Sequence, residues 1–412
     1  MRRLRRGACV IGLLAASAVA FGACGGRSAS SSAPNSGGSS GSPGGAASQG
    51  GAASQGGDGG GVDVPIPTAG NAAGGVSGMP ASTSAGSSQG GATGAPEAGR
   101  AGSTSTEAGA SGEAGATHAP GTARPPSCVG LASSCGSSAS DDCCASPTVP
   151  GGSFMIGNPN YAAHPADVTA FALDKYEVTV GRFRAFVSAY GGPPAAGAGA
   201  HPLIAGSGWQ SAWDTKIAAD SVALTSAVQC DAKYPVWDAS GAHDALPMNC
   251  VSWYEAFAFC AWDGGRLPTE TEWAFAVRAG AEQRLYAWGN TPVPDDKQDS
   301  TSAYANYFCL GDGDKGGGLC SLADILPVGS KPLGAGKYGQ VDLLGSVWEW
   351  ELDSASPTAQ CSDCASLGGE VRVFNGGSWY EPAGFLTSSN DQRQPPDGRT
   401  PYLGVRCARA NK

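Results

Sequence analysis

The 412-residue chain contains 65 glycines, more than twice the average share, and only 15% of its residues are charged. Its net charge of −10 and its pI of about 4.9 exclude the basic face that nucleic-acid binding or adhesion to acidic lipids requires. All ten tryptophans lie between Trp209 and Trp379, whereas residues 25–126 include no aromatic side chain, so only the second part of the chain can bury a core.

The chain begins with an export signal, which we expect at residues 1–23. Arginines at four of the first six positions precede an apolar stretch from 9 to 21 that is too short for a comfortable membrane span. The stretch ends in Phe21-Gly22-Ala23-Cys24, which resembles the lipobox of bacterial lipoproteins, so we expect Cys24 to be lipidated. Ordinary cleavage that leaves Cys24 free is the alternative. Gly25 rather than Asp follows the cysteine, which favours the outer membrane, facing the periplasm or the cell surface.

Residues 24–126 are expected to form a disordered tether. They consist mainly of Gly, Ala, Ser, Thr and Pro, and they include a tandem repeat of Gly-Ala-Ala-Ser-Gln-Gly at 45–56. Such a segment has too little apolar surface to offset the entropy lost on folding. A Gly/Ser chain of this length spans roughly 50–60 Å, so it would hold a folded domain away from the membrane.

Twelve cysteines follow Cys24, and an even number in an exported chain indicates disulfides. Four of them crowd into a Cys-rich segment at 127–146, where three connectivities are open and a zinc site is the alternative: Cys128, Cys135, Cys143 and Cys144. Cys361 and Cys364 form a C-x-x-C motif among Ser, Thr, Ala and Gly, which favours a structural bridge over a redox role.

The globular region, expected at 147–412, carries three clear helix signals. Apolar residues at 183, 186, 187 and 190 predict a helix over 180–190. Ser252 with Glu255, and Thr269 with Glu272, form two capping boxes that predict helices beginning there and ending before Gly264 and Gly280. Elsewhere short apolar pieces are broken by Gly, Pro and Asn, which indicates an irregular α+β fold with few, short strands.

Eight motifs follow one another through this region. Four lie at 149–157, 175–179, 247–253 and 286–290, and the others are Gly-Arg-Leu-Pro-Thr-Glu-Thr-Glu-Trp (265–273), Gly-Ser-Val-Trp-Glu-Trp (345–350), Asn-Gly-Gly-Ser-Trp (375–379) and Gly-Val-Arg-Cys (404–407). In this order they resemble the sulfatase-modifying-factor family, whose best-known members are formylglycine-generating enzymes. The resemblance implies a compact fold related to C-type lectins, with little regular secondary structure. Trp348 and Trp350 alternate around Glu349, so both rings are expected on one side of a strand.

The resemblance also implies copper chemistry that this sequence does not support. Formylglycine-generating enzymes carry two copper-binding cysteines after the Gly-Gly-Ser motif, at positions that hold Glu381 and Leu386 here. No cysteine lies between Ser378 and Cys407, and Cu(I) prefers thiolate ligands, so we expect neither copper nor formylglycine formation. The related ergothioneine-type sulfoxide synthases use iron-binding histidines from a further domain. No two of this chain's four histidines have helical spacing, so that centre is not expected either.

Two further features follow only from the resemblance. Cys260 and Cys407 stand at positions that are paired in animal members of the family, so we expect a bridge between them. A family calcium site maps onto Asn306 and the carbonyl group of Tyr307, but the position of its Asp falls near Cys320. We hypothesise that a Cys309–Cys320 bridge replaces the ion, with calcium the only cofactor left open.

Residues 375–378 are the expected pocket wall, because the family's catalysis takes place immediately after them. The expected lining consists of Ser378, Trp379, Tyr380, Glu381, Asn390, Arg393 and Arg406. Aromatic and charged side chains suit a peptide, a glycan or another small polar ligand. Two functions remain: a tethered ligand- or protein-binding module with no catalytic residue, or an oxidoreductase that acts on a protein cysteine or a small thiol through a different metal site.

Overall fold

The computed structural model describes residues 124–157, 163–292, 303–313 and 319–411. The expected signal peptide, Cys24 and nearly all of the expected tether lie outside the described residues. Within the described ranges, no helix has the length and apolar character needed to cross a membrane.

The described residues form four α-helices, three of them at the predicted places. Both predicted capping boxes are present, at Ser252 with Glu255 and at Thr269 with Glu272. One short helix, α2, was not predicted. The α-helices are α1 (Val180–Ala189), α2 (Ser221–Ala227), α3 (Trp253–Trp262) and α4 (Glu270–Val277), and the 3-10 helices are η1 (Pro126–Cys128), η2 (Ser211–Lys216), η3 (Gly280–Glu282), η4 (Leu322–Asp324), η5 (Pro332–Gly334) and η6 (Ala383–Phe385).

Ten short strands form three small sheets, which confirms the irregular α+β fold. All neighbouring pairs are antiparallel except β3 with β6 and β5 with β9. The sheets have the orders β1 (Thr148–Val149), β4 (Phe171–Leu173), β10 (Ala408–Ala410); β2 (Gly152–Ile156), β3 (His164–Val168), β6 (Cys361–Ser362); and β8 (Asp391–Gln394), β7 (Arg372–Asn375), β5 (Trp348–Trp350), β9 (Leu403–Gly404).

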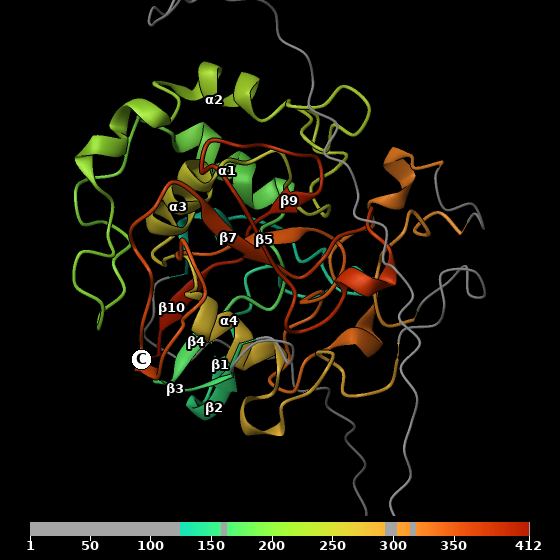
Figure 1. Ribbon diagram of the computed structural model, residues 1–412. Coiled ribbons are helices and arrows are strands. Elements are labelled where there is room, and N and C mark those ends of the chain that lie inside the picture. The colour runs from blue at the N-terminus through green and yellow to red at the C-terminus, as the bar shows by residue number, and fades with distance from the viewer. Residues whose placement is uncertain (1–123, 158–162, 293–302, 314–318, 412) are drawn as a thin grey trace, which may run out of the picture. The chain divides into compact units, whose positions relative to one another are not determined.

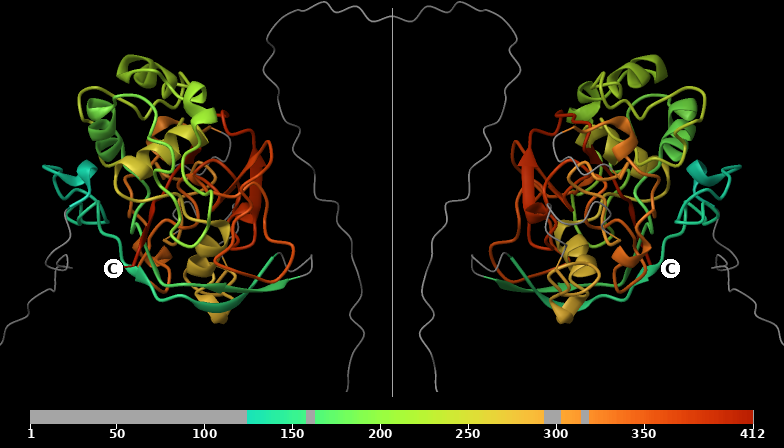
Figure 2. Two further views of the ribbon diagram at one scale, coloured as in Figure 1. Left: turned by 90° about the vertical axis from the view of Figure 1, so that its left-hand side faces the viewer. Right: turned by 90° about the vertical axis from the view of Figure 1, so that its right-hand side faces the viewer.

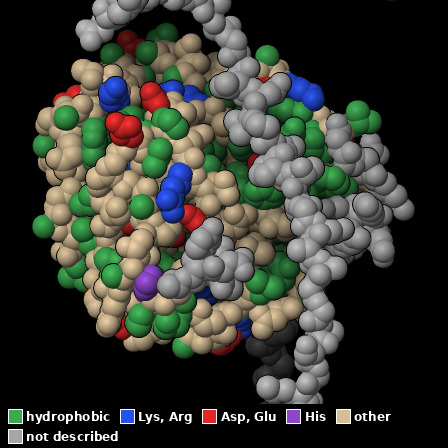
Figure 3. Space-filling view, viewed as in Figure 1, with side chains coloured by type: hydrophobic (Ala, Val, Ile, Leu, Met, Phe, Trp, Pro, Cys, Tyr) green, Lys and Arg blue, Asp and Glu red, His purple; other side chains and the backbone are tan. Residues whose placement is uncertain are grey.

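The four-stranded sheet β8–β7–β5–β9, called the central sheet below, lies between two regions of the molecule. Figure 1 shows β5 and β7 in the middle, with α1 and α3 on one side and α4 with β1 to β4 on the other. The long β2–β3 hairpin runs along one end of the body (Figure 2). On the face drawn in Figure 3, cationic and anionic side chains are scattered among polar and apolar ones rather than gathered by sign.

Aromatic side chains fill the larger core, which joins α1, α3 and the central sheet. Phe183 of α1 stacks on Phe259 of α3 with ring centroids 5.6 Å apart. The rings of Trp348 and Trp350 both meet Phe374, at 5.3 and 5.5 Å, so they share one face of β5 as predicted. A second core lies between α4 and β1 to β4.

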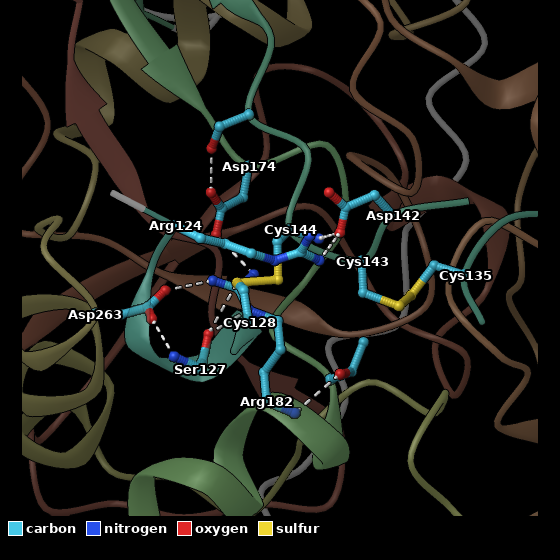
Figure 4. The surroundings of a disulfide bond; sticks show 12 residues. Arg124, Ser127, Cys128, Cys135, Asp142, Cys143, Cys144, Asp174, Arg182 and Asp263 are labelled. Atoms are coloured by element: carbon cyan, nitrogen blue, oxygen red, sulfur yellow. Dashed lines mark hydrogen bonds and ion pairs between the residues drawn. A yellow bond between two sulfur atoms is a disulfide. The ribbon is translucent and has the colours of Figure 1, made fainter. Parts of the chain in front are cut away.

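The Cys-rich segment closes two disulfides of its own and is hydrogen-bonded to the rest of the domain. Its four cysteines pair as Cys128–Cys144 and Cys135–Cys143, which settles the open connectivity. Ser127 next to them donates its N–H to the Asp263 carboxylate at 2.9 Å, and its hydroxyl accepts a bond from Arg182 Nε at 3.0 Å (Figure 4). The folded part therefore includes this segment, and η1 starts at Pro126, one residue before the boundary expected at 127.

The remaining cysteines form four more bridges, so all twelve cysteines in the described ranges are paired. The three bridges expected from the sequence are present, and Cys230–Cys250 is the fourth. The expected ones are Cys260–Cys407, Cys309–Cys320 and Cys361–Cys364.

Replacing both Cys260 and Cys407 by alanine should cost the most stability of any bridge removal. The bridge spans 147 positions, and constraining so long a loop contributes about 5 kcal/mol in the chain-entropy model. The Cys361–Cys364 bridge spans three positions and contributes about 2 kcal/mol in the same model, so its double alanine variant is the matched control. Urea unfolding of both variants measures the difference; equal losses would contradict the loop-length argument.

Candidate functional site

The segment after β7 forms a tight turn around the Ser378 hydroxyl. Gly376 and Gly377 have φ angles of 111° and 74°, which residues with a side chain rarely adopt, so the chain turns sharply there. Ser378 is buried; its hydroxyl donates to the carboxylate of Glu381 and accepts the N–H of Tyr380 at 3.1 Å. The turn thus fixes the side chain of Glu381.

Glu381 lies close to the aromatic side chains of Trp348 and Tyr402. The charge of Glu381 acts on Tyr402. Burial raises the pKa of Glu381 above its usual range, while the hydrogen bond from Ser378 opposes the shift. The carboxyl group is therefore held in place by the Ser378 hydroxyl.

Leu386 fills the second of the two positions that hold cysteines in formylglycine-generating enzymes. It is fully buried in a small apolar cluster with Ala305, Tyr307 and Leu310. A Cβ atom added to Gly377 would lie 2.7 Å from Leu386 Cδ2, so the two residues pack without a gap. Leu386 offers no donor atom and Glu381 offers no thiolate, so these residues do not fit a Cu(I) pair.

The other expected lining residues do not all reach this turn. Trp379 is fully buried against Tyr234, with ring centroids 4.9 Å apart, and Tyr380 is 46% exposed and stacks on Tyr402. The structure does not bring Arg406 to the turn: its side chain lies in the core, where it pairs with Glu349 at 2.7 Å.

Asn390 and Arg393 lie further along the chain. Asn390 Nδ2 donates to the Phe385 carbonyl at 3.1 Å and so closes a local turn. Arg393 is on β8, where it pairs with Asp391 at 2.8 Å and lines a cavity of about 460 Å³. Ser378 and Glu381 are not part of this cavity lining, so the structure divides the expected pocket between two places.

The cavity lies along α4, and sequence reasoning missed it. Its lining includes Glu270, Ala274 and Arg278, which are spaced at i, i+4 and i+8 and therefore share one helix face. Asn375 of β7 and residues 355–358 and 388–393 supply other parts of the lining. The spacing of an acid, a small residue and a base after the capping box was the signal available in the sequence.

Buried carboxyl groups gather at the Glu270 end of the cavity. Burial, with the nearby charge of Asp353, raises the pKa of Glu270 to about 8. Burial also raises the pKa of Asp353 to about 7 and that of Glu351 well above its usual range. Oε2 of Glu270 and Oε2 of Glu351 are buried without a hydrogen-bond partner among the described residues. Unpartnered buried carboxyl groups are costly, so this end lacks hydrogen-bond donors.

The calcium expectation rests on Asn306 and the carbonyl group of Tyr307. Asn306 is buried, its Nδ2 donates to the Asp324 carbonyl at 2.8 Å, and its Oδ1 has no partner within the described ranges. The Asp324 carboxylate already accepts the N–H groups of Ser321 and Asp312. In the described part of the chain no three His, Cys, Asp or Glu residues are grouped to hold a metal ion. Because calcium takes six to eight oxygen ligands, these residues alone do not make its site. The Cys309–Cys320 bridge is present, and its replacement of the ion stays a hypothesis.

Comparison with known proteins places most of the described domain in one family. The family described as sulfatase-modifying factor enzyme 1-like domain matches residues 133–411. The chain belongs to this family. The match confirms the resemblance that the eight motifs indicated.

Individual family members share part of their length with this chain. The mouse protein named inactive C-alpha-formylglycine-generating enzyme 2 is 34% identical over 183 residues, which is 43% of this chain and 54% of that protein. The chain thus spans about half the length of this relative and of its bovine counterpart. The formylglycine-generating enzyme of Thermomonospora curvata is 27% identical over 63% of this chain and 91% of its own. Among solved structures, PvdO from Pseudomonas aeruginosa is 25% identical with a TM-score of 0.42, over 64% of this chain and 93% of that chain.

Stability of this family member should fall as the pH rises from 5.5 to 8.5. Glu270, Asp353 and Asp342 have pKa values raised to about 8, 7 and 6, so the folded chain keeps protons that the unfolded chain has already lost. The unfolded state then binds fewer protons, and the free energy of unfolding decreases with pH across this window. We expect Tm to drop by several degrees.

Glu270→Gln isolates one contribution to this pH dependence. The amide cannot ionise, so the variant should lose less stability between the two pH values than the parent chain. Thermal unfolding at both pH values measures the slopes. A parent Tm that rises with pH, or an unchanged slope in the variant, would show that Glu270 ionises normally.

Proposed function

We propose that this chain is a membrane-tethered binding module of the sulfatase-modifying-factor family that does not form formylglycine. The observation that carries the proposal is the turn after Ser378. Glu381 is held there by the Ser378 hydroxyl, and Leu386 packs directly on Gly377. A Cu(I) pair needs two thiolates at these positions.

The disulfides support the same proposal. Every cysteine in the described ranges is paired, so none of them offers a free thiolate to a metal or to a thiol substrate. A family relative of this chain is itself named as inactive, at 34% identity. Retention of the fold without the reaction therefore has a precedent within the family.

The proposed location follows from the N-terminal sequence. Lipid on Cys24 would anchor the chain at the outer membrane, and the Gly/Ser-rich segment would hold the domain roughly 50–60 Å away from the anchor. A domain displayed in this way suits capture of a peptide, a glycan or another small polar ligand from the periplasm or the medium.

The purified chain should not oxidise a substrate cysteine. Incubation with copper, oxygen and a Cys-x-Pro-x-Arg peptide should give no aldehyde by mass spectrometry, with an active formylglycine-generating enzyme as positive control. The double variant Glu381→Cys with Leu386→Cys should gain Cu(I) binding, because it restores two thiolates at the turn. Aldehyde formed by the unmodified chain would overturn the proposal.

Metal analysis separates the alternative function. One relative, the hercynine oxygenase of Mycobacterium tuberculosis, is 34% identical over 39% of this chain, which keeps an oxidoreductase acting on a protein cysteine or a small thiol as the second candidate. Stoichiometric copper or iron in the purified chain would favour that candidate. We expect neither metal in stoichiometric amount.

Cys24→Ser should release the protein from the membrane. Without the thiol no acyl chains can be attached, and each buried CH₂ contributes about 0.8 kcal/mol to anchoring. Labelling with a fatty-acid analogue and membrane fractionation measure the outcome in a bacterial host. Label on the serine variant, or a membrane-bound variant, would contradict lipidation at this position.

A further inference from the structure

The cavity along α4 has an acid and a base in its lining, near opposite ends of the helix. Glu270 and Arg278 are separated by eight helical positions, which is about 12 Å along the helix axis, and the small side chain of Ala274 lies between them. Trp273, Ala355 and Pro357 add apolar surface to the lining. The volume of about 460 Å³ is that of a small-molecule site.

The Glu270 end gathers acidic groups without enough cations nearby to keep them ionised. Glu270 is only 6% exposed, and its Oε2 has no hydrogen-bond partner among the described residues, since the nearby Ser356 hydroxyl donates to Asp391 instead. Asp353 and Glu351 lie close enough that the charges of the three acids repel one another. The cation near Glu270, Arg393, is already bonded to Asp391 at 2.8 Å. A ligand cation would supply the missing donors.

The other end of the helix carries a cation, Arg278, on which the charges of Glu270 and Asp391 both act. Arg278 is 7% exposed and, within the described ranges, forms no ion pair. Its Nε donates to the Ser388 carbonyl at 3.2 Å and its Nη1 to the Met155 carbonyl at 3.0 Å. These two bonds fix the guanidinium group and leave its Nη2 outside any hydrogen bond to the described residues. A guanidinium held this way is suited to a carboxylate.

We propose that this cavity binds an elongated zwitterion, with its ammonium group at Glu270, its carboxylate at Arg278 and an apolar stretch over Ala274. A short peptide with free ends or an ω-amino acid has this chemistry. The inference rests on the proposed binding role and names its ligand class. The site is separate from the turn at Glu381 and Leu386.

Titration calorimetry of the purified chain with three matched probes tests the assignment. 6-Aminohexanoate carries both charged ends, hexanoate lacks the amine and hexylamine lacks the carboxylate. The zwitterion should bind at one site and at least about tenfold more tightly than either single-charge probe, because charge-assisted hydrogen bonds form at both ends. Equal affinity for all three, or preference for a probe with one charge, would overturn the proposal.

Two variants locate the binding. Glu270→Gln preserves shape, so it should weaken 6-aminohexanoate about tenfold and leave hexanoate unchanged. Ala274→Leu keeps both charged residues but fills part of the cavity between them, so it should weaken the binding of all three probes. Glu282→Gln removes an exposed acid outside the cavity and is the matched control. Unchanged zwitterion binding by the folded Glu270→Gln and Ala274→Leu variants would place the ligand elsewhere. The aldehyde assay reports on the Glu381 turn, so a failure here is distinguishable from a failure of the proposed function.

Discussion

Arg406 and Glu349 form an ion pair in which neither side chain is exposed, and the elements around both candidate sites are joined through it. Arg406 also donates to the carbonyl of Asp174 after β4, at 2.9 Å, and Glu349 accepts the indole N–H of Trp273 from α4, at 3.0 Å. These contacts join β5, α4 and the end of β4 to the segment between β9 and β10, where Arg406 lies. Losing either partner would leave a buried charge unpaired, at a cost of about 3–5 kcal/mol, in a fold whose short sheets supply few backbone hydrogen bonds.

Among the described residues, buried Asp and Glu side chains outnumber buried Arg side chains. This excess of acids affects both the stability of the fold and the proposed binding site. Glu177 and Asp342 lie near the single guanidinium of Arg406, and burial raises the pKa values of both. Around α4 the same excess raises the pKa of Glu270, which lines a cavity that is open to a ligand. The Glu270 carboxyl group in this cavity would be stabilised by a ligand cation. Residues kept in such unfavourable states are typical of functional sites rather than of structural cores.

The sequence predicted the parts of this structure that depend on neighbouring residues. Capping boxes place α3 and α4 because the bonds join residues three apart, and Trp348 and Trp350 share a face because strand residues alternate. The Cys260–Cys407 bridge followed from the family resemblance instead. The destination of Arg406 was not predictable, since its partner lies 57 positions away. The cavity was not predicted for the same reason, because α4, residues 355–358 and β8 meet only in the folded chain.

The two sites differ in how they tolerate change. Leu386 fills the turn after Ser378 and packs on Gly377, so a metal cannot return there without new side chains. The cavity along α4 depends instead on Glu270 and Arg278, which helix geometry positions independently of that turn. Trp273 lies beside them in the sequence, and its bond to Glu349 ties the helix to the core whatever occupies the copper position. A family member can therefore lose the oxidation chemistry and still retain a shaped, charged cavity, because separate contacts hold the two places.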